Sequence, residues 1–152
     1  MRKRLVILLV LATLLSLTLV ACGDDAPATV PAYPGATSIT LADSVRSQFT
    51  TGLASVKNPT VDGFKTSDDI AKIKSTFDSS FKSDGWNDVS SQLTSQPNAK
   101  AINDAGGFVI GYSKGSKSAT VLAIPNAYTE GSGITGLNAN ENAFIVVSGT
   151  PS

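Results

Sequence analysis

The chain of 152 residues contains a single cysteine, Cys22, and no histidine. A cysteine thiol can act as a nucleophile, form half of a disulfide or bind a metal ion. A lone cysteine excludes an internal disulfide and a Cys-x-x-Cys redox pair. The lack of histidine removes the commonest metal ligand and the usual general base near neutral pH. We therefore expect no resident metal and no cofactor, and the role of Cys22 depends on its neighbours in the sequence.

Two other sets of residues have the types that hydrolysis requires. Ser79 and Lys82 have the S-x-x-K spacing of serine acyl-enzymes, in which the lysine lies one helical turn from the nucleophile. Six aspartates could supply a carboxylate pair or calcium ligands, but none has EF-hand spacing. These are Asp62, Asp68, Asp69, Asp84, Asp88 and Asp104. Since Ser79 falls near the end of an expected helix rather than at its start, we expect no catalytic residue here and keep a Ser/Lys or paired-Asp hydrolase as the alternative.

A glycine motif, GSGITG at residues 131–136, matches G-x-G-x-x-G. Binding of a dinucleotide phosphate needs a strand directly before such a motif and a helix that opens within it. The flanking stretches, PNAYTE and LNANENAF, are typical of loops. The motif therefore predicts a loop.

The N-terminus has the pattern of an export signal. Arg2, Lys3 and Arg4 precede an uncharged apolar run at residues 5–20, and polar residues follow from Gly23. This run is shorter than the roughly 20 residues that a membrane-spanning helix needs. From Cys22 onward the chain has nine basic and twelve acidic residues, a net charge of −3. A mildly acidic surface argues against nucleic acid as a partner.

The sequence Leu19-Val20-Ala21-Cys22 resembles the lipobox of bacterial lipoproteins, in which aliphatic and small residues precede a cysteine. The resemblance implies that the Cys22 sulfur is alkylated by a diacylglyceryl group and that a dedicated peptidase cuts between Ala21 and Cys22. It predicts a signal peptide at 1–21 and an exported protein. It also predicts attachment to the cell membrane through lipid, with the domain facing away from the cytoplasm.

After the lipobox we expect a tether and one domain. Three prolines, at positions 27, 31 and 34, predict an extended spacer over residues 22–35, followed by a single domain at 36–152. The clearest element of the domain is an amphipathic helix at about 67–84, with Thr66 as its cap and Asp69 at its third position. Gly85 suits a left-handed helix end, and Trp86 should fold back on Phe81. The apolar stripe of this helix comprises Ile70, Ile73, Phe77 and Phe81.

Alternating apolar residues predict strands at 36–42, 106–113, 117–124 and 143–149. A short strand is also predicted at 86–93, and residues 45–53 are a weaker candidate. Residues 55–63 are typical of a turn because Asn58-Pro59 should interrupt regular structure. A glycine-containing turn should join the strands at 106–113 and 117–124. Together these elements predict an α+β fold, with a small antiparallel sheet packed on one long amphipathic helix.

A second resemblance extends from Tyr33 to Trp86. YPGA at 33–36, FKTSDD at 64–69, an amphipathic helix and GW at 85–86 are similar to a module of uncharacterised bacterial envelope lipoproteins and secreted proteins. It implies architecture and an envelope location, without an activity. We expect a non-enzymatic binding or structural module whose partner is an envelope protein, a glycan or a lipid.

A small-ligand binding protein is a further alternative. It would need a deep apolar pocket between helix and sheet. A core filled by the large aromatic side chains argues against such a pocket. These side chains are Phe77, Phe81, Trp86 and Phe108.

Overall fold

A computed structural model describes residues 28–52, 56–94 and 97–151. The expected signal peptide, the lipobox and Cys22 lie outside these ranges. Within them, the strands form a six-stranded antiparallel sheet in the order β1-β2-β6-β5-β4-β3. The strands are β1 (Thr37–Ile39), β2 (Val56–Thr66), β3 (Asn87–Asp88), β4 (Phe108–Lys114), β5 (Lys117–Ile124) and β6 (Asn142–Pro151). The helices are α2 (Asp43–Gly52), α3 (Ile70–Ser83), α4 (Ser90–Thr94), α5 (Pro97–Asp104) and the 3₁₀-helix η2 (Asn126–Tyr128).

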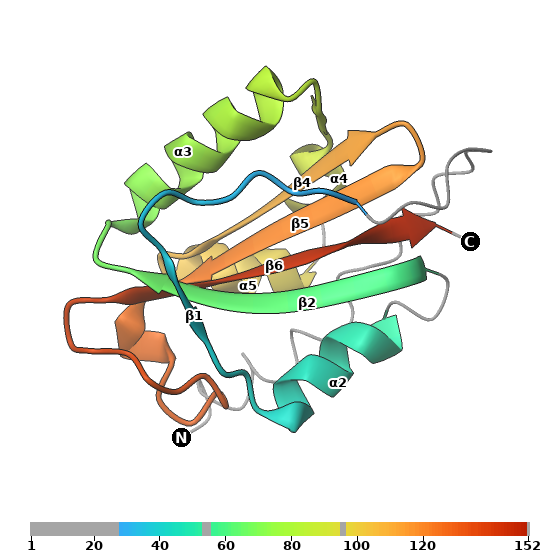
Figure 1. Ribbon diagram of the computed structural model, residues 1–152. Helices are drawn as coiled ribbons and strands as arrows, with labels where there is room; N and C mark the ends of the chain where they lie inside the picture. The colour runs from blue at the N-terminus through green and yellow to red at the C-terminus, as the bar shows by residue number, and fades with distance from the viewer. Residues whose placement is uncertain (1–27, 53–55, 95–96, 152) are drawn as a thin grey trace.

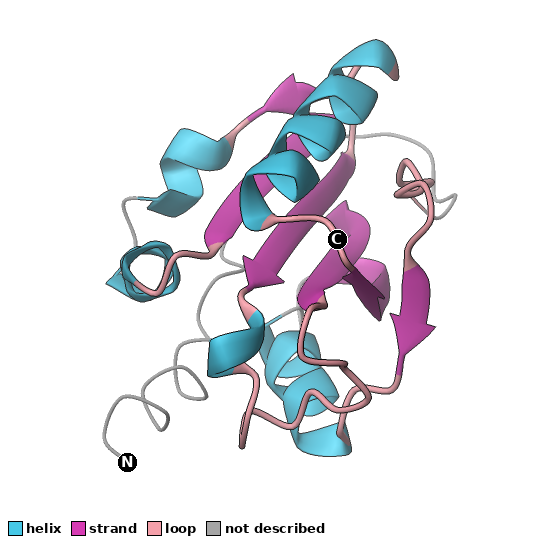
Figure 2. Ribbon diagram, turned by 90° about the vertical axis from the view of Figure 1, so that its left-hand side faces the viewer, coloured by secondary structure: helices cyan, strands magenta, loops and turns pink. Residues whose placement is uncertain are grey.

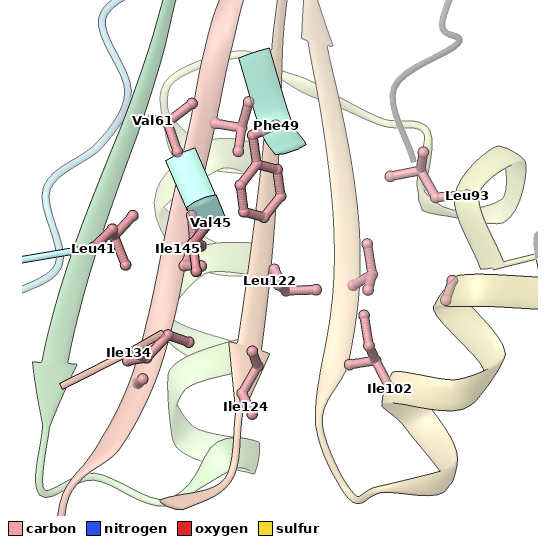
Figure 3. Packing of buried hydrophobic residues seen from close by; sticks show 14 residues of the cluster. Leu41, Val45, Phe49, Val61, Leu93, Ile102, Leu122, Ile124, Ile134 and Ile145 are labelled. Atoms are coloured by element: carbon pink, nitrogen blue, oxygen red, sulfur yellow. The ribbon is translucent and has the colours of Figure 1, made fainter. Parts of the chain in front are cut away.

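Helices lie around the central sheet (Figures 1 and 2), and a separate apolar core fills each of its two faces. On one face α3 packs through Ile73, Phe77 and Phe81 against alternate residues of β4, β5 and β6. On the other face α2, α4 and α5 pack against the intervening residues of the same strands (Figure 3). The α+β class is therefore confirmed, but a single long helix accounts for one face of the sheet only.

Helix α3 ends as its sequence predicts. Gly85 has a φ of +77°, and the Trp86 amide donates to the Phe81 carbonyl at 2.9 Å. The rings of Trp86 and Phe81 meet edge to face, with centroids 5.2 Å apart. This is the hydrophobic contact that accompanies a Schellman motif, so the expected fold-back of Trp86 is confirmed.

The start of α3 differs from the prediction. Asp69, not Thr66, is the N-cap, and its side chain accepts a hydrogen bond from the Lys72 amide at 2.7 Å. Thr66 is instead the last residue of β2, where it pairs with Asn142. Because the sheet keeps the backbone of Thr66 extended, Thr66 cannot start the helix. The carboxylate of Asp69 caps it instead.

Two segments differ in secondary structure from the prediction. The sequence predicts a weak strand at 45–53, yet Val45 and Phe49 belong to helix α2 and are buried against the sheet. An i, i+4 apolar pair fits a helix, and it also satisfies the two-residue period of a strand. Residues 56–63 of the turn predicted at 55–63 belong instead to strand β2, which accommodates Pro59 through a register shift between Lys57 and Thr60.

Three of the remaining strands follow the prediction closely, whereas β1 covers only Thr37–Ile39 of the strand predicted at 36–42. β4, β5 and β6 fall within two residues of the expected segments, and Gly115 forms the turn between β4 and β5 with a φ of +58°. The segment at 86–93 is a strand only at β3, because the Asp88 side chain accepts the Ser90 amide at 2.8 Å and α4 begins there.

Candidate functional site

The segment of residues 28–36, here called the strap, crosses the sheet alongside α3 (Figure 1). Tyr33 of the strap is only 9% exposed, and its ring lies 5.3 Å from the rings of both Phe77 and Phe144. Ala28 and Val30 also pack against this core. Part of the segment expected to be a spacer at 22–35 therefore belongs to the folded domain.

A polar contact fixes the strap to α3. The Tyr33 hydroxyl donates to Asp68 Oδ2 at 2.7 Å, and Lys72 Nζ contacts Asp68 Oδ1 at the same distance. The hydrogen bonds from Lys72 and then Tyr33 hold the pKa of Asp68 below its ordinary value. Burial, reinforced by the hydrogen bond to Asp68, raises the pKa of Tyr33 to about 12. The strap is thus held by apolar packing and by a phenol that stays protonated at neutral pH.

We expect the free energy of unfolding to fall as the pH rises above about 10. The pKa of Tyr33 is raised in the folded state. As the pH rises, Tyr33 therefore loses its proton in the unfolded chain first, and this stabilises the unfolded state relative to the folded one. Burial raises the pKa of Tyr112 as well, and that residue adds to the same loss. In Tyr33→Phe the fall measured by urea unfolding between pH 9 and 12 should be smaller by about 1–2 kcal/mol. Tyr128→Phe, at an exposed tyrosine, is the matched control and should leave the profile unchanged; an unchanged profile in Tyr33→Phe would contradict the account.

The strap forms one wall of a pocket of about 400 Å³. The floor comes from the face of β2 and β6 that points toward the strap, and α3 contributes Phe77. One part of the pocket is apolar, where the Phe64 and Phe144 rings stack with centroids 5.3 Å apart. The full lining is Ala28, Val30, Pro31, Ala32, Tyr33, Ala36, Thr60, Asp62, Phe64, Phe77, Phe144, Val146 and Ser148.

The opposite part of the pocket is polar. Thr60 Oγ1 and Ser148 Oγ lie 2.8 Å apart and share a hydrogen bond, and Asp62 follows on the same face of β2. Sequence reasoning missed this group, because Thr60 and Asp62 fall in the segment interpreted as a turn. The alternation of Thr60, Asp62 and Phe64 was the available signal, since a two-residue period puts all three on one face.

In the described part of the chain, large aromatic side chains fill the space between α3 and the sheet, where a small-ligand protein would need a deep pocket. Phe77, Phe81, Trp86 and Phe108 are all buried there. The pocket lies instead beside α3, where the strap covers the edge of the face formed by β2 and β6.

The structure does not bring the S-x-x-K residues into a site. Ser79 and Lys82 are both exposed on α3, and neither lines the pocket. Among the aspartates, Asp69 caps α3, Asp88 binds the start of α4 and Asp104 pairs with Lys100 at 2.8 Å. No group of three or more potential metal-binding side chains occurs in the part of the chain that the structure describes.

The glycine motif forms a loop, as predicted. It follows the 3₁₀-helix η2 rather than a strand, and no helix opens within it. Gly131, Gly133 and Gly136 all have positive φ. Ile134 pairs with Leu41 and is buried, so the loop covers the core around α2.

Comparison of the chain with protein-family models, with curated proteins and with solved structures finds no match. Among the described residues, no helix has both the length and the apolar character needed to cross a membrane.

Proposed function

We propose that this protein is a lipid-anchored protein of the bacterial cell envelope whose domain binds a small ligand in the pocket under the strap. The lipobox at residues 19–22 supports the anchor and the export. The proposal rests mainly on the position of the strap in the chain. The strap begins six residues after Cys22 and forms one wall of the pocket. Six residues span at most about 20 Å. The pocket therefore lies close to the proposed anchor.

A binding role accounts for the pocket better than hydrolysis does. A hydrolase needs a nucleophile and a base, or two carboxylates, that converge in one cavity. Of the described residues that line the pocket, Asp62 is the only acid. No lysine of the described chain lines the pocket beside the hydroxyls of Thr60 and Ser148. This set of side chains suits recognition of a ligand through one charge, two hydroxyls and an apolar wall.

The pocket should bind a neutral apolar dye such as Nile red, with saturation at one molecule per chain. Thr60 is exposed and lines the pocket, so Thr60→Trp should place an indole ring in the space that the dye occupies. We expect this substitution to weaken dye binding about tenfold, which corresponds to the loss of about 1.4 kcal/mol of contact. Fluorescence titration of the purified full-length protein measures the effect.

Thr37→Trp is the matched control, because Thr37 is an exposed strand residue of β1 that does not line the pocket. Its dye affinity should equal that of the wild type. Equal affinities in all three proteins, or no saturable binding at all, would contradict a binding role for this pocket.

A further inference from the structure

Among the residues that the structure describes, the pocket is lined by an acidic side chain but by no basic one. Of the described residues that line it, Asp62 is the only acidic one, and no lysine or arginine contributes to the lining. An anionic ligand would face this carboxylate without a compensating cation. A cationic ligand would gain a charge-assisted hydrogen bond.

The two hydroxyl groups near Asp62 have oxygen lone pairs that can also accept hydrogen bonds. Thr60 and Asp62 lie two residues apart on β2, and Thr60 is directly opposite Ser148 on β6. In the hydrogen bond between the two hydroxyls one oxygen donates and the other accepts, so both keep free lone pairs. An ammonium group has three donors and no acceptor, which matches a carboxylate with two hydroxyl oxygens on one side of it.

The rest of the pocket suits an apolar body. Val30, Phe64 and Val146 line it together with Phe144, on which the Phe64 ring stacks. The faces of aromatic rings such as Phe64 and Phe144 would also attract a nearby cation through a cation–π interaction. A volume of about 400 Å³ lies in the range of small-molecule sites.

We propose that the pocket binds a small primary amine, with its ammonium group at Asp62, Thr60 and Ser148 and its apolar body against Phe64, Phe144 and Val146. This assignment rests on the proposed binding function and names the class of ligand. It involves no covalent step.

Three probes that share one apolar body test the assignment: 3-phenylpropylamine, 3-phenylpropan-1-ol and 3-phenylpropanoate. Isothermal titration of each into the purified full-length protein gives its Kd. We expect the amine to bind about tenfold more tightly than the alcohol, because its hydrogen bonds to the site are charge-assisted. The carboxylate should bind more weakly than the alcohol.

Asp62→Asn keeps the shape of the side chain and removes its charge, so it should bring the amine and the alcohol to within about twofold of each other. Asp104→Asn is the matched control, because Asp104 is an exposed residue of α5 that does not line the pocket. This variant should keep the tenfold preference.

An alcohol that binds wild type as tightly as the amine would overturn the ammonium assignment and leave the binding function standing. The same conclusion follows if Asp62→Asn keeps the preference for the amine. If none of the three probes binds, the assignment is overturned, and the dye titration then decides separately whether the pocket binds ligands.

Discussion

Replacing Cys22 with alanine is expected to abolish the incorporation of a palmitate analogue into this protein and to leave its precursor uncut. The lipobox resemblance assigns the Cys22 sulfur as the nucleophile that takes the diacylglyceryl group, and alanine has no thiol. Two acyl chains hold a protein stably at a membrane where one gives only reversible binding, because each buried methylene contributes about 0.8 kcal/mol. Metabolic labelling measures the first effect, and the size of the chain on a denaturing gel measures the second.

Thr18→Ala is the matched control for that experiment, because Thr18 lies directly before the lipobox and within the apolar run. It should be labelled and processed like the wild type. Labelling of Cys22→Ala at the level of the wild type would contradict lipidation at this sulfur.

Replacing Phe77 with alanine is expected to lower the free energy of unfolding by about 3–5 kcal/mol. Phe77 is 1% exposed, and its ring contacts those of Tyr33, Phe81 and Phe144. It therefore joins the strap, helix α3 and strand β6 in one core. The substitution removes these contacts and leaves a cavity that the rigid sheet cannot close. Urea unfolding followed by circular dichroism measures the change.

Ser79→Ala, two residues further along α3 and exposed, is the control and should change stability by less than about 0.5 kcal/mol. Phe77→Leu retains much of the volume and should give an intermediate loss, which keeps the comparison possible if the alanine variant does not fold. A loss below about 1 kcal/mol in Phe77→Ala would contradict the packing described here.

Local sequence signals located α3 and the central strands correctly because each had a long and unambiguous apolar period. Phe108, Ile110 and Tyr112 alternate, and all three are buried on the face covered by α3. The end of α3 was also predictable, because Gly85 is free to adopt a positive φ and Trp86 has an aromatic partner, Phe81, five residues earlier.

The fold around the pocket could not be read in the same way. Pro59 normally interrupts a strand, and only the register shift in β2 shows how the sheet accommodates it. The prolines of the strap favour extended chain whether it is free or packed. The burial of Tyr33 between Phe77 and Phe144 shows that the strap is packed on the domain rather than free. That burial depends on residues more than 40 positions away in the sequence.

The candidate site was less predictable than the fold, because it depends on pairing between distant strands. Asp62 was one of six aspartates without distinctive spacing, and Ser148 had no motif around it. The antiparallel register between β2 and β6 places Thr60 opposite Ser148 and so assembles the polar group. The S-x-x-K spacing had the stronger local signal, yet both of its residues are exposed on α3.

The most direct test of a lipid-anchored envelope protein is the mass of the N-terminal peptide of the protein isolated from cell membranes. We expect a chain that begins at Cys22 and carries a diacylglyceryl group on its sulfur. A chain that begins at Met1, or at any residue other than Cys22, or a Cys22 with an unmodified thiol, would contradict it.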